Sequence, residues 1–248
     1  MLKAKLWKIV FLLSLLFCLV INCSNPFSSL TDLDIELTPE DYVEAELIAL
    51  CLSGELVAPD DIWDQVLRDL ADIRSTYGST FGSILSIRFR APWVCGNLII
   101  GFDSSTAQMV ANGDYNAWNQ LNESYQVTEI DTSSIRYDWV LVHFKDRLHP
   151  RRLAEMYEVL PGVAYAEPNG IMGDRSNIYP RQTFRGITYL FREGWGDCPS
   201  GCIYNIYWYF GIGWNRPTFF GQWNPQEIHR EPDWWNEAKQ NIDLYRKW

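Results

Sequence analysis

The chain has 248 residues, of which 47% are hydrophobic and 21% are charged, and its formal net charge is −10. This composition is too apolar for a disordered protein, and a chain of this length can bury a substantial core. The excess of acids argues against a nucleic-acid partner, because binding to phosphates needs clustered lysine and arginine. The 12 tryptophans are unusually many, and seven of them lie between Trp195 and Trp248.

The N-terminal residues combine a basic segment with an apolar run. Lys3, Lys5 and Lys8 precede a run from Ile9 to Ile21 that only Ser14 interrupts. This pattern is typical of a secretory signal, and the run is shorter than the roughly 20 apolar residues of a membrane-spanning helix. The sequence therefore predicts export.

The end of this run, Leu19-Val20-Ile21-Asn22-Cys23, resembles a bacterial lipoprotein signal, in which an apolar residue stands three positions before a lipidated cysteine. The resemblance covers residues 1–23. It implies a signal peptide over 1–22, lipidation of Cys23 and attachment to a membrane through the acyl chains. Ser24 favours the outer membrane of the cell envelope over the inner one, and a secreted or periplasmic protein is the alternative.

Export changes the interpretation of the cysteines, because an even number outside the cytosol predicts disulfides. Cys18 leaves with the signal, and four cysteines remain after the lipidated one. The expected pairs, one of three possible connectivities, are Cys51–Cys95 and Cys198–Cys202. A metal site that adds Asp197 and a remote histidine, or a redox pair, is a less favoured interpretation of the second pair, whose spacing is C-x₃-C.

A polar tether over 23–37 leads to a predicted helical hairpin over 38–80. Each helix starts with a proline followed by two acids, at Thr38-Pro39-Glu40-Asp41 and at Ala58-Pro59-Asp60-Asp61, and apolar residues then recur at helical spacing. The short connection between them indicates an antiparallel pair.

This predicted hairpin is strongly acidic. From Ser24 to Asp72 there are 13 acids and one base, Arg68. A docking or cation-binding surface is one interpretation. We favour the solvated outer face of two amphipathic helices, which is the commoner use of such residues.

Residues 81–170 follow a different pattern. Alternation predicts a strand over Leu85–Arg90, and from Asn97 the order becomes strand, helix, strand, strand, helix, strand. The expected strands are 98–102, 127–130, 139–144 and 163–167, and the expected helices start after Asp103 and at Pro150, the first with a break at Asn112-Gly113 before it resumes through Tyr125. This order predicts a ferredoxin-like domain, an antiparallel sheet with two helices on one face.

Two stretches of this region resemble the inhibitory propeptide of subtilisin-type proteases. They are Trp139-Val140-Leu141-Val142-His143-Phe144 and Leu160-Pro161-Gly162-Val163-Ala164-Tyr165-Ala166-Glu167-Pro168-Asn169, with His149-Pro150 opening the helix between them. The resemblance covers 97–169 and is close in its second half. It implies the ferredoxin-like fold and, more weakly, protease binding. No spaced serine-protease motif occurs from Gly170 to Trp248, so we do not expect a protease.

The segment 171–248 is rich in aromatic residues. Strand-like runs at 187–192 and 203–210 flank a loop, which predicts an aromatic β-hairpin followed by a tail. The loop Trp-Gly-Asp-Cys-Pro-Ser-Gly-Cys resembles one in uncharacterised secreted bacterial proteins, which implies no activity. Clustered tryptophans can stack on sugars or form core packing. The tryptophans left open for ligand binding are Trp214, Trp223, Trp234 and Trp235.

No motif for a catalytic site, a metal or a cofactor is found, so we expect neither an enzyme nor a cofactor. The sequence predicts an α+β protein that is exported and lipid-anchored, with a non-enzymatic binding or structural role in the envelope and a protein or glycan partner. One alternative is a protease inhibitor or chaperone-like module. The other is a carbohydrate-binding protein that uses the C-terminal tryptophans.

Overall fold

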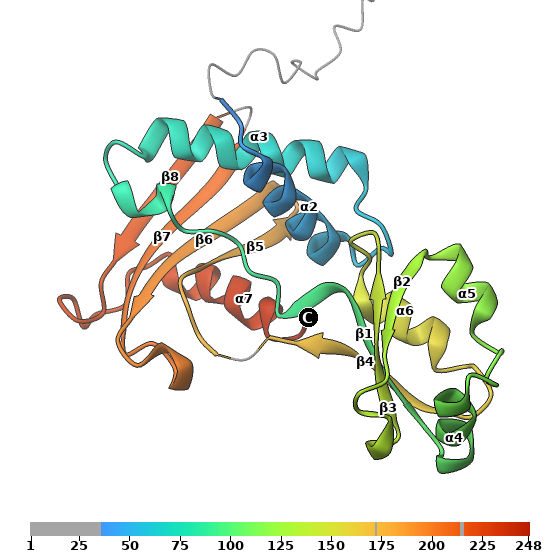
Figure 1. Ribbon diagram of the computed structural model, residues 1–248. Helices are drawn as coiled ribbons and strands as arrows, with labels where there is room; N and C mark the ends of the chain where they lie inside the picture. The colour runs from blue at the N-terminus through green and yellow to red at the C-terminus, as the bar shows by residue number, and fades with distance from the viewer. Residues whose placement is uncertain (1–35, 172, 214–215) are drawn as a thin grey trace, which may run out of the picture. The chain divides into compact units, whose positions relative to one another are not determined.

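The structure, a computed structural model, describes residues 36–171, 173–213 and 216–248 (Figure 1). The predicted signal, the lipidation residue Cys23 and most of the tether lie outside these residues. The described part contains helices and two antiparallel four-stranded sheets, which confirms the α+β class. Within these ranges no helix is both long and apolar enough to cross a membrane.

The predicted helical hairpin is present as α2 (Pro39–Ser53) and α3 (Asp60–Tyr77). The backbone N–H of Thr38 donates a hydrogen bond of 2.8 Å to the Asp41 carboxylate, which forms part of a capping box at the start of α2. Gly54 ends α2 with φ +64°, a left-handed conformation that glycine adopts without the steric cost of a Cβ. Local signals therefore set both ends of α2.

The acids of this hairpin are not all on a solvated face. Glu44 and Asp69 are buried. The Glu44 carboxylate accepts hydrogen bonds from the Arg74 guanidinium over 2.7 and 3.1 Å, from Arg88 over 3.0 Å and from the N–H of Phe89 over 2.7 Å. The interpretation as an outer face is wrong for these two residues. Charge-assisted hydrogen bonds allow the Glu44 carboxylate to be buried, and Asp69 accepts from the hydroxyl of Tyr189.

The predicted ferredoxin-like domain has the expected topology. Its elements are β1 (Trp93–Phe102), α4 (Ser104–Asn112), α5 (Asn119–Ser124), β2 (Val127–Asp131), η3 (Ile135–Tyr137), β3 (Trp139–Phe144), α6 (Pro150–Tyr157) and β4 (Val163–Gly170). The strands pair antiparallel in the order β2-β3-β1-β4, as in a split βαβ arrangement. Figure 1 shows α4, α5 and α6 on one side of this sheet, where Leu98, Val142 and Leu153 share a core.

The segment before β1 is not the strand that its alternation predicts. A short 3₁₀ helix, η2 (Gly82–Leu85), is followed by residues that pair with no strand, although Ile87 and Phe89 are buried. The Phe89 N–H donates to the Glu44 side chain, and the Arg90 N–H donates to the side chain of Asn177. Side chains thus replace the neighbouring strand as hydrogen-bond partners.

The C-terminal segment is a four-stranded meander rather than an isolated hairpin. The predicted hairpin corresponds to β6 (Gly186–Trp195) and β7 (Tyr204–Gly213), joined through η4 (Cys198–Ser200). Two further strands flank it, β5 (Asn177–Thr183) beside β6 and β8 (Arg216–Trp223) beside β7. These two strands are the edges of the sheet. Each contains a proline, which a strand accepts mainly at an edge.

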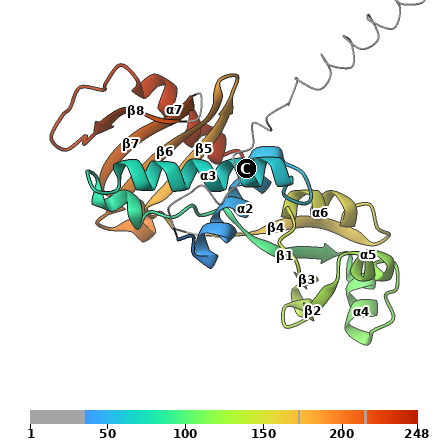
Figure 2. The ribbon, with the colours of Figure 1, turned by 90° about the horizontal axis from the view of Figure 1, so that it is seen from above.

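Helices cover both faces of this sheet. On one face α3 contacts β8, and the hydroxyl of Tyr77 donates to the carbonyl of Pro217 over 3.2 Å. In Figure 2 α3 runs across the strands. On the other face lies α7 (Trp235–Tyr245), whose buried Trp235 and Ala238 pack in a cluster with Tyr209. The helical hairpin and the C-terminal sheet therefore share a core.

Candidate functional site

Two of the tryptophans that the sequence left open for ligand binding are in the core, and a third packs against it. Trp223 and Trp235 are buried with ring centroids 4.5 Å apart, and the Trp223 indole N–H donates to the Ile228 carbonyl over 2.8 Å. Trp234 is half-buried and stacks on Tyr209, with centroids 5.7 Å apart. Trp214 lies outside the described residues. The rings of Trp223 and Trp235 therefore expose little surface to solvent, whereas Trp234 remains partly exposed.

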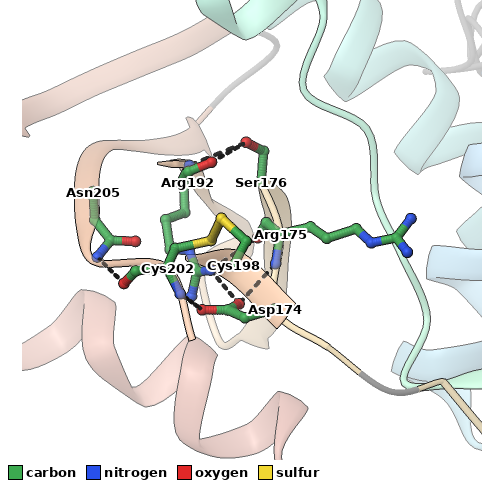
Figure 3. Close-up of a disulfide and its surroundings, with 8 residues drawn as sticks. Asp174, Arg175, Ser176, Arg192, Cys198, Cys202 and Asn205 are labelled. Carbon is green, nitrogen blue, oxygen red and sulfur yellow. Dashed lines mark hydrogen bonds and ion pairs between the residues drawn. A yellow bond between two sulfur atoms is a disulfide. The ribbon is translucent and has the colours of Figure 1, made fainter. Parts of the chain in front are cut away.

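The predicted Cys198–Cys202 disulfide is present, as Figure 3 shows. The bond uses both sulfurs of the C-x₃-C loop. Within the described ranges, no group of three or more His, Cys, Asp or Glu side chains could hold a metal ion.

Asp174 connects this disulfide loop to the polypeptide just before β5. Its backbone N–H donates to the Cys198 carbonyl over 2.9 Å, and its carboxylate accepts from the Cys202 N–H over 3.0 Å and from the Arg192 guanidinium (Figure 3). Burial by itself raises the pKa of Asp174, but these hydrogen bonds outweigh it and lower the pKa. Asp174 is therefore an ionised carboxylate whose hydrogen-bonding capacity is used within the protein.

The second predicted disulfide is not formed, because Cys51 and Cys95 are free thiols. Cys51 is buried on α2, and Cys95 is half-buried on β1. Burial raises the pKa of Cys95 to about 11. Burial, reinforced by the nearby Cys95, raises the pKa of Cys51 well above its usual value. The two thiols are close enough to interact, but the predicted bond between them is absent.

A cavity of about 390 Å³ lies where the start of β1 and the start of β5 meet α2 and α7. We call it the β1–β5 cavity. It is bounded by aromatic and aliphatic side chains together with three arginines and one acid. Its lining residues are Leu47, Phe89, Arg90, Ala91, Trp93, Val94, Cys95, Arg147, Ile171, Gly173, Asp174, Arg175, Asn177, Tyr179 and Tyr245. A cavity of this size is within the usual range for small-molecule sites.

The backbone of Arg90 is held from two sides. Asn177 of β5, which is buried, accepts from the Arg90 N–H over 2.8 Å and donates to its carbonyl over 3.2 Å. The hydroxyl of Tyr245, on α7, donates to the same carbonyl over 2.7 Å. The guanidinium of Arg90, by contrast, has no ion pair or hydrogen bond to any residue in the described ranges. A fixed backbone therefore carries a charged group that is free to bind.

Arg175 repeats this arrangement. Its N–H donates to the Asp174 carboxylate over 2.9 Å and its carbonyl accepts from Arg192 over 2.9 Å. Figure 3 shows its side chain extending away from the disulfide. This guanidinium also lacks a partner within the described ranges. The third arginine, Arg147, is different, because it forms a salt bridge of 3.0 Å with Glu46.

The wall of the cavity adds a buried donor. Trp93 is 2% exposed, and its indole N–H makes no hydrogen bond to the described residues. This N–H is shielded from solvent and lies beside the Cys95 sulfur, a weak acceptor that interacts with it. Apolar surface from Phe89 and Tyr179 completes the wall.

The sequence did not predict this site. Arg90 lies 87 residues before Asn177 and 155 residues before Tyr245, and only the fold brings these segments together. The signal that was available is weak: Arg90 ends an alternating apolar run, and Arg175 stands in the polar stretch Gly173-Asp174-Arg175-Ser176-Asn177.

Comparison of the chain with protein-family models, with curated proteins and with solved structures gives no match.

Proposed function

We propose that the protein is an exported, lipid-anchored binding protein of the cell envelope, that it acts without catalysis, and that its ligand occupies the β1–β5 cavity. The cavity carries the proposal, because it combines apolar walls with a few charged groups whose backbones are held by hydrogen bonds. Such a combination is usual for a site that selects a ligand by shape and charge.

Export is supported by the pattern of residues 1–23 and by the Cys198–Cys202 disulfide, since disulfides persist mainly in oxidising compartments. Labelled palmitate should be incorporated by the wild-type chain and not by Cys23→Ala, and the lipoprotein-processing inhibitor globomycin should cause the precursor to accumulate. Normal processing in globomycin, or labelling of Cys23→Ala, would show that Cys23 is not lipidated.

Binding in the cavity can be tested with protein purified from its own envelope. Native mass spectrometry should detect a retained small molecule on the wild-type protein. Ala91→Phe places a ring in the wall of the cavity and should abolish retention, whereas Ala111→Phe makes the same change at an exposed position of α4 and should not. Equal retention by both variants would place the ligand elsewhere and contradict the proposal.

A second candidate function, protease inhibition, is favoured by the order β2-β3-β1-β4, which agrees with the propeptide resemblance. Topology alone is a weak argument, because one fold serves many functions. We expect the full chain to inhibit subtilisin-type proteases if this candidate is right, and failure against a broad panel would leave only a shared fold.

A further inference from the structure

We infer that the ligand of the β1–β5 cavity is an anion: a carboxylate or phosphate group attached to an apolar, preferably aromatic, body. This inference rests on the proposed function, because it names the chemistry of the molecule that the cavity would hold.

The charge of the cavity is positive. Arg90, Arg147 and Arg175 line it, and Asp174 is the acid among its lining residues. The Asp174 carboxylate accepts hydrogen bonds from Arg192, Cys202 and Arg175, so it has little capacity left for a ligand cation. An anion, in contrast, meets uncompensated positive charge. The guanidinium groups carry several donors in a planar fork that matches the oxygens of a carboxylate or a phosphate.

The backbones of the two arginines without partners are held in place. Asn177 and Tyr245 fix the backbone of Arg90, while Asp174 and Arg192 fix that of Arg175. Binding therefore needs to order only the side chains, which lowers its entropic cost.

The walls favour a ligand that is more than an inorganic ion. Leu47, Phe89, Ala91, Ile171, Tyr179 and Tyr245 contribute apolar surface to the cavity. A small inorganic anion would leave this surface in contact with water, whereas an apolar body removes it from water and gains hydrophobic free energy.

The test uses three probes that share a naphthyl group: 1-naphthoate, 1-naphthyl phosphate and the neutral 1-naphthamide. Isothermal titration calorimetry with the full mature chain should show that at least one anion binds more tightly than the amide. Which anion binds better distinguishes a carboxylate ligand from a phosphate ligand. Affinity for the anion should fall as salt is added, because the arginines are solvent-accessible.

Substitution of the arginines should give a graded series. Arg90→Gln and Arg175→Gln should each weaken anion binding about tenfold or more, since each loses a charge-assisted hydrogen bond. Arg147→Gln should have a smaller effect because Glu46 already pairs with Arg147. Arg136→Gln, at an exposed site on η3, should have none. Binding of the amide should be unchanged in all four variants, which also shows that they are folded.

The outcomes distinguish a failure of the anion inference from a failure of the proposed function. If the amide binds as tightly as both anions, or if Arg90→Gln and Arg175→Gln bind the anions normally, the ligand is not selected by charge and the inference is wrong, although the cavity can still be a binding site. If no probe binds, the inference is also wrong. The proposal that the ligand occupies this cavity fails when the ligand retained from the envelope is unaffected by Ala91→Phe.

Discussion

The hydroxyl of Tyr189 on β6 donates a hydrogen bond of 2.8 Å to the carboxylate of Asp69 on α3, and both side chains are buried. Burial raises the pKa of Asp69 to about 7, although the hydrogen bond from Tyr189 opposes the shift. A titratable contact therefore joins the helical hairpin to the C-terminal sheet.

The contribution of Asp69 to the stability of the protein should fall as the pH rises from about 4 to about 7. In this window the folded state holds a proton on Asp69 that the unfolded state has released, so the contribution is complete below pH 3.8 and is lost as the pH passes the folded pKa of about 7. A shift from 3.8 to about 7 corresponds to a contribution to the free energy of unfolding of at most about 4 kcal/mol.

Asp69→Asn should remove this dependence, because an amide oxygen still accepts from Tyr189 and does not ionise. Urea unfolding should give similar stability for the two proteins at pH 4 and a more stable variant at pH 8. Parallel curves for wild type and Asp69→Asn across this range would show that Asp69 does not titrate in the folded protein with a raised pKa.

Glu44 and Glu46 make a matched pair on α2. Glu44 is buried and bound by Arg74 and Arg88, whereas Glu46 pairs with Arg147 in a more exposed position. Glu44→Gln should lower the free energy of unfolding by about 3–5 kcal/mol, because the buried Arg74 loses its two short contacts with Glu44 and keeps only the 3.3 Å ion pair with Asp41. Glu46→Gln should cost at most about 1 kcal/mol. Chemical denaturation of both variants measures the difference, and equal costs would contradict the structural role of Glu44.

Elements whose limits are set by neighbouring residues in the sequence could be predicted. Asp103 caps α4 by accepting from the Thr106 N–H, and Gly113 ends the helix with φ +79°, as the sequence indicated. The third expected strand of the ferredoxin-like domain coincides with β3. These signals are local, so no knowledge of the tertiary structure is needed to interpret them.

Elements that depend on distant partners could not be predicted. The alternation before Pro92 is that of a strand, but the backbone N–H groups of Phe89 and Arg90 bond to the side chains of Glu44 and Asn177. Nothing in the local pattern distinguishes these partners from a neighbouring strand. The arginines of the β1–β5 cavity were missed for the same reason, since single exposed arginines have no characteristic spacing.

Of the four cysteines in the described residues, two should be free thiols and two should be joined in a disulfide. Iodoacetamide added to the urea-unfolded protein without reductant should label Cys51 and Cys95 and leave Cys198 and Cys202 unlabelled. In the folded protein Cys95 should react slowly at pH 8, because its pKa is about 11 and the thiolate is the nucleophile.

Peptide mass spectrometry resolves the four positions. Its control is a reduced sample, in which all four should be labelled after unfolding. A peptide in which Cys51 is linked to Cys95 would contradict the structure and would restore the pairing that the sequence predicts.

Asn241 anchors α7 to the sheet. It is fully buried, and its side-chain NH₂ donates to the carbonyl of Tyr179 over 2.8 Å and to the carbonyl and hydroxyl of Thr188 over 3.2 Å each. Asn241→Leu should lower the free energy of unfolding by about 1–3 kcal/mol, because the buried acceptors of Tyr179 and Thr188 lose their donor. The same substitution at Asn236, an exposed position on α7, should be nearly neutral.

The effect of Asn241→Leu should extend to the β1–β5 cavity, because α7 also carries Tyr245, whose hydroxyl holds the Arg90 carbonyl. A loosened α7 frees the backbone of Arg90, so hydrogen exchange should speed up in α7 and at residues 88–92 together. Tyr245→Phe removes only the hydroxyl and should speed up exchange at 88–92 while leaving most of α7 protected. If both variants leave exchange at 88–92 unchanged, α7 does not hold Arg90 in place, and Asn177 alone must supply the preorganisation.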